Sequence, residues 1–164
     1  MKHLILAFLL LASPARAEDL WQGRTAAFFG VHFIDTSTEG AINGPRADET
    51  ARVAMLDDYI AAGLAEGGLT LVDLAPAEQD LAAVKDPEHC NGCDTRIAQK
   101  LGADYSVVAE VQKVSNLILA INIYVRDAAT GAQIRGQAVD IRGNTDDSWR
   151  RGARYILRYN IFRE

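Results

Sequence analysis

YSVVAEVQKVSNLILAINIYVR, which occupies residues 105–126, is the most informative segment of the chain. Its two halves are rich in the branched and aromatic side chains that are typical of strands. Ser115 and Asn116 separate the halves and favour a tight turn. The second half alternates with period two, which places on one strand face Leu117, Leu119, Ile121, Ile123 and Val125. The segment therefore predicts an antiparallel hairpin of strands at residues 105–113 and 117–126.

A third strand is expected to follow this hairpin. Thr130-Gly131 favours a second turn, and residues 134–141 resume a strand pattern that is more polar. Because Gly136 interrupts this strand and charged side chains flank it, we expect it at an edge of the sheet. The three strands together predict an antiparallel meander.

The part of the chain before the meander predicts alternating strands and helices. Residues 25–35 and 69–74 are apolar runs of strand length, and Gly30 in the first run is a candidate β-bulge. Residues 36–46 contain glycine and proline and are expected to form a loop. From residue 48 the apolar positions recur at helical spacing up to a stop at Gly67-Gly68, namely Val53, Leu56, Ile60 and Leu64.

Two shorter helices and a final one complete the pattern. Pro76 favours a helix start, and Asp94 is expected to be the N-cap of a short helix that ends near Gly102. The last helix begins near Asn144-Thr145 and has an inner stripe of Trp149, Ala153, Ile156 and Tyr159 or Asn160. Its Gly152 costs about 1 kcal/mol of helix propensity relative to alanine, so we expect a close approach to the sheet there. The order βαβα(α)βββα predicts an α/β (α+β) fold with helices packed on a mixed sheet.

The first 17 residues have the pattern of a secretory signal peptide. Lys2 and His3 precede an apolar run, and Ala15-Arg16-Ala17 has the small-x-small form of a cleavage site. The apolar run is shorter than the roughly 20 residues that a transmembrane helix needs. We therefore expect export to the periplasm, with a mature chain, residues 18–164, that forms a single α/β domain without a transmembrane segment.

The charge of the chain argues against a nucleic-acid partner. The sequence has 17 Lys and Arg residues against 22 Asp and Glu residues, and its net charge is −5. Removal of Lys2 and Arg16 with the signal peptide makes the net charge −7. Binding to nucleic acids depends on many Lys and Arg side chains that neutralise phosphates, which this composition does not supply.

PEHCNGCDTR, residues 87–96, contains the only two cysteines. In an exported compartment such a pair most often forms a disulfide, so we expect a Cys90–Cys93 bond that rigidifies the turn. Two alternatives stay open. A helix N-terminus lowers the pKa of a nearby thiol, which would suit a redox centre. His89, Cys90 and Cys93 would instead suit zinc or copper if both sulfurs were thiolates.

Positive charge is concentrated on the last helix, at Arg150, Arg151, Arg154 and Arg158. Arginine pairs with carboxylate and phosphate groups in a forked geometry, which makes this stripe a candidate docking surface for an acidic partner or an anion. Pairing with Asp146, Asp147 and acidic neighbours on the sheet is the simpler explanation.

The sequence contains no catalytic signature. Asp57-Asp58 and Asp146-Asp147 are adjacent on helices, so their side chains point apart, and we interpret them as solvated or helix-start charges. His32 is expected to be packed within the first strand. The serines have neither a nearby histidine nor the glycines of a nucleophile elbow. We therefore expect no enzymatic activity and no cofactor.

Five segments carry a family resemblance: AFFGVHFIDTS, LAEGGLTLVD, AQKLGADYSVVAEVQKVSN, RDAATGAQ and SWRRGARYILR. Together they resemble an uncharacterised family of secreted bacterial proteins, a domain of unknown function. They are more distantly similar to the amino-terminal domain of TolB and related envelope proteins. The resemblance implies an α/β fold and an envelope location, and it carries over no catalytic residue.

These observations predict an exported, non-catalytic accessory protein that binds an envelope protein or a small ligand. Similar chains are associated with periplasmic quinoprotein alcohol oxidation, so the resemblance also implies a link to that process. The alternative hypothesis is a thiol redox or metal-handling protein centred on the Cys90–Cys93 loop.

Overall fold

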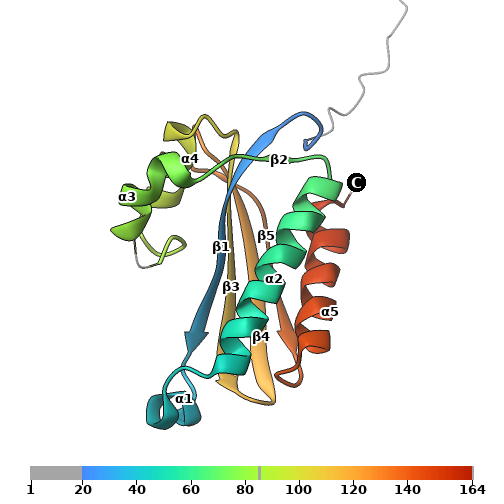
Figure 1. The fold of residues 1–164 in the computed structure, drawn as a ribbon. Coiled ribbons are helices and arrows are strands. Elements are labelled where there is room, and N and C mark those ends of the chain that lie inside the picture. The colour runs from blue at the N-terminus through green and yellow to red at the C-terminus, as the bar shows by residue number, and fades with distance from the viewer. Residues whose placement is uncertain (1–19, 85, 164) are drawn as a thin grey trace, which may run out of the picture.

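The fold is a mixed β-sheet with helices on both faces, seen in a computed structural model that describes residues 20–84 and 86–163 (Figure 1). The strands are β1 (Thr25–Asp35), β2 (Thr70–Leu71), β3 (Tyr105–Ser115), β4 (Ile118–Asp127) and β5 (Gln133–Ile141). Their order in the five-stranded sheet is β2-β1-β3-β4-β5. β1 runs parallel to β2 and β3, whereas β3, β4 and β5 form the predicted antiparallel meander. The predicted α+β class is therefore confirmed.

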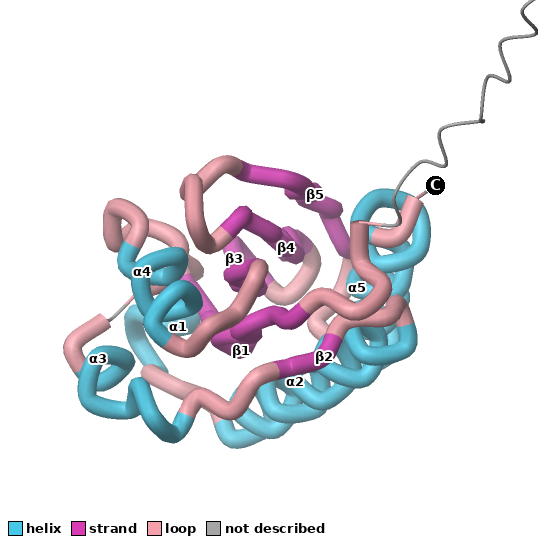
Figure 2. Tube along the Cα trace, turned by 90° about the horizontal axis from the view of Figure 1, so that it is seen from above, coloured by secondary structure: helices cyan, strands magenta, loops and turns pink. Residues whose placement is uncertain are grey.

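The helices divide between the two faces of the sheet. They are α1 (Thr38–Asn43), α2 (Ala47–Glu66), α3 (Glu78–Ala82), α4 (Cys93–Lys100) and α5 (Asp146–Ile156). A 3-10 turn, Ala75–Ala77, precedes α3, and a π-helical turn, Leu157–Ile161, continues α5. Seen from above, α2 and α5 lie side by side against one face of the sheet, and α4 lies on the other side (Figure 2).

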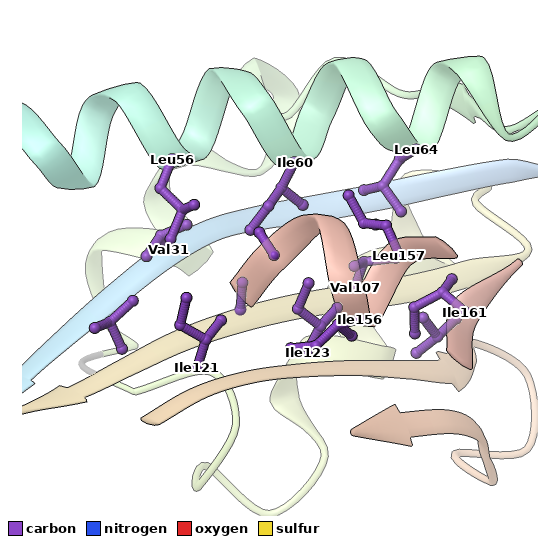
Figure 3. Close-up of a cluster of buried hydrophobic side chains, with 14 of the residues drawn as sticks. Val31, Leu56, Ile60, Leu64, Val107, Ile121, Ile123, Ile156, Leu157 and Ile161 are labelled. Atoms are coloured by element: carbon purple, nitrogen blue, oxygen red, sulfur yellow. The ribbon is translucent and has the colours of Figure 1, made fainter. Parts of the chain in front are cut away.

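The main core fills the space between the sheet, α2 and α5 (Figure 3). Leu56, Ile60 and Leu64 of α2 are fully buried there, as their helical spacing predicted. They meet the alternating apolar residues of the meander, of which Leu119, Ile121, Ile123 and Val125 are buried. Full burial of one such side chain contributes about 1.5–3 kcal/mol, so this interface is the main source of stability. A smaller apolar cluster lies under α4.

Gly30 forms the predicted bulge in β1. Its φ is +82°, and the register with β3 shifts between Phe28 and Val31. The backbone N–H of Val31 donates instead to Asp57 Oδ1 on α2, at 2.7 Å. The interpretation of Asp57 as a solvated charge was therefore wrong, because this carboxylate caps the bulge and its burial raises its pKa.

Two local predictions before the meander were also wrong. The expected loop contains α1, because the Ser37 hydroxyl accepts a hydrogen bond from the N–H of Gly40 at 3.0 Å and caps a short helix. The expected strand at residues 69–74 is only two residues long. Asp73 ends it, since its carboxylate accepts a hydrogen bond from the N–H of Ala75 at 2.9 Å and turns the chain.

Three residues near the meander and the last helix also differ from expectation. Leu117 lies in the β3–β4 turn and is 72% exposed, because the strand begins one residue later. Asp94 is not the N-cap of α4, since Gly92 takes that position in a left-handed conformation. After Ile156 the chain forms a π-helical turn, which holds more residues per turn than an α-helix and so shifts the buried face. Ile161 is therefore buried, and Tyr159 is exposed.

Gly152 and β5 agree with expectation. A Cβ atom at Gly152 would lie 2.8 Å from Ile141 Cγ2 and 2.9 Å from Ile121 Cδ1, so the glycine allows α5 to approach the sheet closely. β5 is an edge strand. Two of its carbonyl oxygens accept hydrogen bonds from side chains of the same strand: Arg135 donates to Ile134 O at 3.0 Å, and Gln137 donates to Ala138 O at 2.7 Å.

Among the helices of residues 20–84 and 86–163, none combines the length and hydrophobicity that a membrane span requires. The predicted signal peptide, residues 1–17, lies outside the described residues.

Candidate functional site

The loop that leads into α4 is closed by the two cysteines. Cys90 and Cys93 lie at disulfide distance, with their Cα atoms 5.5 Å apart. Between them Asn91 and Gly92 both have positive φ, which reverses the chain within the short loop. This geometry fits the predicted disulfide. In this oxidised form neither sulfur is a thiolate, so neither is available as a metal ligand or a redox nucleophile.

Arg126 of β4 fixes this loop against the sheet. Its guanidinium donates to Asp94 Oδ2 at 2.9 Å and forms a very short ion pair with Glu88. The hydroxyl of Ser106 on β3 also donates to Asp94 Oδ2, at 2.7 Å. This contact explains why Asp94 does not cap its own helix, since its carboxylate is engaged by side chains of two strands. Burial raises the pKa of Glu88 above its ordinary value.

Next to this network, Asp86, His89 and Glu110 form an acidic site around the imidazole of His89. His89 Nδ1 lies 2.9 Å from Asp86 Oδ2 and 3.5 Å from Glu110 Oε1. One ligand atom from each of the three residues lies within 4.8 Å of the others. The hydrogen bond to Asp86 raises the pKa of His89, and burial raises the pKa of Glu110.

The structure thus brings His89 together with two carboxylates rather than with the cysteine sulfurs. Sequence reasoning missed Asp86 and Glu110. Asp86 lies in a loop of charged residues where it has no distinguishing neighbour. Glu110 does carry a signal, because it is an acidic residue inside the apolar run of β3, on the same face as Ser106 and Val108. A buried carboxylate in a central strand calls for a partner.

The three arginines of α5, and Arg158 in the π-helical turn that continues it, lie along two different flanks. Arg151 forms a very short ion pair with Asp147 and lines a hollow between β5 and α5. Arg154 and Arg158 line a groove of about 460 Å³ between α2 and α5. Arg150 is exposed and precedes Arg154 by one helical turn. The structure therefore separates Arg151 from the other members of the predicted stripe.

The expected neutralisation of these arginines is only partial. Asp147 pairs with Arg151, but Asp146 pairs with Arg52 of α2, whose Nε lies 3.0 Å from Asp146 Oδ1. Within residues 20–84 and 86–163, Arg150 and Arg154 have no carboxylate oxygen within 4.0 Å. The guanidinium of Arg158 lies 5.4 Å from the ring centre of Tyr159.

Small residues on α2 shape the groove. A Cβ atom at Gly67 would overlap the ring of Phe162, and one at Gly63 would lie 2.7 Å from Leu157 Cδ1. Leu157 and Phe162 therefore pack directly on the backbone of α2 and form an apolar floor. Glu66 and Tyr59 line the groove on the α2 side. The groove thus combines an apolar floor with two cations on the α5 side.

His32 is not part of either site. It is half-buried in β1, and its Nε2 lies 3.2 Å from the carbonyl oxygen of Phe29. Its packing within the strand matches the expectation from the sequence.

Several solved structures share this fold at low sequence identity. The C-terminal domain of LpoB from Salmonella enterica is 21% identical, with a TM-score of 0.55, and the match covers 77% of this chain and 87% of that chain. The same domain from Escherichia coli is 20% identical, with a TM-score of 0.55 and coverage of 76% and 87%. Lipoprotein GNA1162 from Neisseria meningitidis is 13% identical, with a TM-score of 0.51 and coverage of 75% and 83%. At these identities the likeness shows the fold alone.

These structures do not support the distant resemblance to TolB, and they give no link to alcohol oxidation. No curated protein matches the sequence. A family model does match, over residues 24–161, which include all five strands and the helices described above. The chain therefore belongs to the family DUF3280, described as "Protein of unknown function (DUF2380)".

Proposed function

We propose that this protein is an exported, non-catalytic accessory protein that binds an acidic segment of an envelope partner in the groove between α2 and α5. The observation that carries the proposal is the position of Arg154 and Arg158, two exposed cations beside an apolar floor on an otherwise acidic protein.

The composition of the groove suits a protein segment. Arginine and aromatic side chains are enriched at protein interfaces, where their burial supplies much of the binding energy. Phe162, packed beside the buried Leu157, offers apolar surface to an aliphatic or aromatic side chain of a partner. Arg154 and Arg158 would pair with carboxylates that flank that side chain. The volume of about 460 Å³ also lies within the range of roughly 300–1,000 Å³ for small-molecule sites, so a small anionic ligand is the competing occupant.

The electrostatics favour a local interaction over general attraction. The full chain has a net charge of −5, so its overall field repels an acidic partner and a local cationic patch is needed to bind one. Binding through Arg154 and Arg158 should therefore be specific for this flank of α5. It should also weaken as salt increases, since the Debye length falls from about 10 Å at 0.1 M to about 3 Å at 1 M.

Three observations support the envelope as the place of action. The first 17 residues have the pattern of a signal peptide. The cysteine pair at disulfide distance fits an oxidising compartment. One structure with the same fold is named a lipoprotein. A role beside periplasmic alcohol oxidation stays a prediction that rests on the family resemblance alone.

Co-purification from the native envelope tests the proposal. The wild-type protein and the variant R154E/R158E would be captured under identical conditions and their partners quantified by mass spectrometry. Arg151→Gln is the matched control, because Arg151 belongs to the same helix but faces the hollow beside β5.

We expect R154E/R158E to weaken binding by about tenfold or more, that is by at least about 1.4 kcal/mol, and so to recover clearly less of a partner that the wild type retains in stoichiometric amount. Arg151→Gln should retain it. Equal recovery with R154E/R158E, while circular dichroism shows both variants folded, would reject the groove as the docking site.

A further inference from the structure

We propose that Asp86, His89 and Glu110 bind a divalent metal ion of the zinc class, without any contribution from the cysteine sulfurs. The three residues come from the loop before α4 and from β3, which lie 21 to 24 residues apart in sequence and meet only in the folded protein. Their ligand atoms lie within 4.8 Å of one another.

Glu110 provides the strongest argument. The residue is 3% exposed, and its Oε1 makes no hydrogen bond. The imidazole of His89 forms an ion pair with that oxygen, its Nδ1 3.5 Å away, and Asn122 hydrogen-bonds to the Glu110 carboxylate. A buried carboxylate oxygen without a hydrogen bond is unfavourable, and most buried polar groups in proteins are hydrogen-bonded. A cation between Glu110 and His89 would satisfy this oxygen.

The charge around the site points in the same direction. Four carboxylates lie in this part of the structure: Glu88 and Asp94 pair with Arg126, whereas Asp86 and Glu110 face His89. Arg126 is fully engaged with Glu88 and Asp94 and does not reach the other two. Asp86 and Glu110 therefore have only the imidazole of His89 between them. A divalent cation would balance both carboxylates while His89 remains neutral.

The orientation of Asp86 is already set by the loop. Its Oδ1 accepts hydrogen bonds from the N–H groups of Glu88 and His89, at 3.1 and 3.2 Å. This leaves Oδ2 directed at His89, at 2.9 Å from Nδ1. Hydrogen bonds of this kind orient metal ligands and raise affinity. The Cys90–Cys93 pair closes the chain directly after His89 and restricts the loop further.

The ligand set indicates which metal to expect. Imidazole nitrogen with two carboxylates suits Zn²⁺ and related transition metals better than Ca²⁺ or Mg²⁺, which prefer oxygen ligands only. Three protein ligands leave one tetrahedral position for water. The side chain of His89 is 66% exposed, so a metal ion can reach the imidazole from the solvent.

Isothermal titration of the untagged, chelator-treated protein with ZnCl₂ tests the proposal, with the disulfide verified as intact by mass spectrometry. We expect one Zn²⁺ per chain and no displacement of it by excess Mg²⁺. Glu110→Gln and His89→Ala should each weaken the affinity by about tenfold or more. His32→Ala is the matched control, because His32 lies beside Glu110 in the β1–β3 register but is not within reach of the other ligand atoms.

Three results would overturn the proposal: no binding of Zn²⁺, equal affinity in His89→Ala, or binding that appears only after the disulfide is reduced. The third result would assign the metal to cysteine thiolates. Because His89 is exposed, its replacement does not endanger the fold, so the test stands even if Glu110→Gln is unstable. The absorption spectrum of the Co²⁺-loaded protein gives an independent readout. Sulfur-to-cobalt charge-transfer bands should be absent, because the proposed ligands are nitrogen and oxygen atoms.

Discussion

Replacing Lys113 by methionine probes the most deeply buried charge in the described part of the chain. Lys113 ends the apolar face of β3 and is 0% exposed. Its ammonium group donates to Glu49 Oε1 at 2.6 Å and to Asp35 Oδ2 at 3.2 Å, and it lies 3.6 Å from Glu39 Oε2. Lys113 thereby joins β1, β3 and the start of α2. The methionine side chain is about as long as that of lysine and as apolar as the lysine stem, but it carries no charge and cannot donate a hydrogen bond.

The expected cost follows from what Lys113 leaves behind. Glu49 is 2% exposed, and after the substitution its carboxylate has no cation beside it. Removal of one partner from a buried ion pair typically costs about 3–5 kcal/mol. Glu49 Oε1 keeps one hydrogen bond, from Asn144 Nδ2 at 2.7 Å, so we expect the lower end, about 3 kcal/mol. The double variant Lys113→Met/Glu49→Leu removes both charges and should recover most of that loss, since apolar replacement of a whole buried pair is often neutral.

Urea denaturation at neutral pH, followed by tryptophan fluorescence, measures the free energy of unfolding of the wild type, Lys113→Met, Glu49→Leu and the double variant. The buried Trp149 is a suitable reporter because it lies in the main core. A loss below about 1 kcal/mol for Lys113→Met would match an exposed ion pair and would refute the reasoning. So would a double variant that is no more stable than the single one.

Three further predictions concern the core, the bulge and acid stability. Gly152→Ala should destabilise the protein by about 1–3 kcal/mol in thermal or urea unfolding, because the new methyl group meets Ile141 and Ile121; a gain in stability would show that helix propensity outweighs this overlap. Asp57→Ala should cost about 1–3 kcal/mol, since it leaves the N–H of Val31 without its acceptor, whereas the neighbouring Asp58→Ala should stay within about 0.5 kcal/mol; equal effects would contradict the capping role. Burial alone would raise the pKa of Asp35, but hydrogen bonds from Ser37 and Lys113 outweigh it and hold the pKa below its ordinary value of 3.8. The stability that ionised Asp35 contributes is therefore fully present above pH 3.8 and is lost as the pH falls through its lowered pKa. The free energies of unfolding of Asp35→Asn and wild type should therefore become equal only in strong acid. A difference that persists unchanged at the acid end would exclude this linkage.

The strands could be predicted because their signal is local. Apolar and polar side chains alternate along β4 because one face of the strand is buried and the other is not. The bounds of β1 matched the expected residues 25–35. Helix ends were harder. Asp94 has the side chain of a good N-cap, yet Ser106 and Arg126, which lie on other elements, engage its carboxylate. A preference measured on isolated helices does not include such competitors.

The candidate sites were less accessible from the sequence. The stripe of arginines was visible as a pattern, but its division into two flanks depends on how α5 packs between α2 and β5. The cluster around His89 was not visible, since Asp86 and Glu110 become neighbours only through the fold. The π-helical turn is a further case, because regular helical spacing placed Tyr159 or Asn160 inward: Tyr159 is exposed, Asn160 is half-buried and donates to Gln137 of β5, and the fully buried residue is Ile161.

The side chains of Arg135 and Gln137 have a consequence for how copies of the protein behave at high concentration. A sheet margin with free carbonyl groups can recruit a strand from another molecule and so begin a fibril. In β5 the carbonyl oxygens of Ile134 and Ala138 already accept hydrogen bonds from side chains of the strand itself. An incoming strand that pairs with these two carbonyl groups would first have to displace both side chains, which opposes association through them.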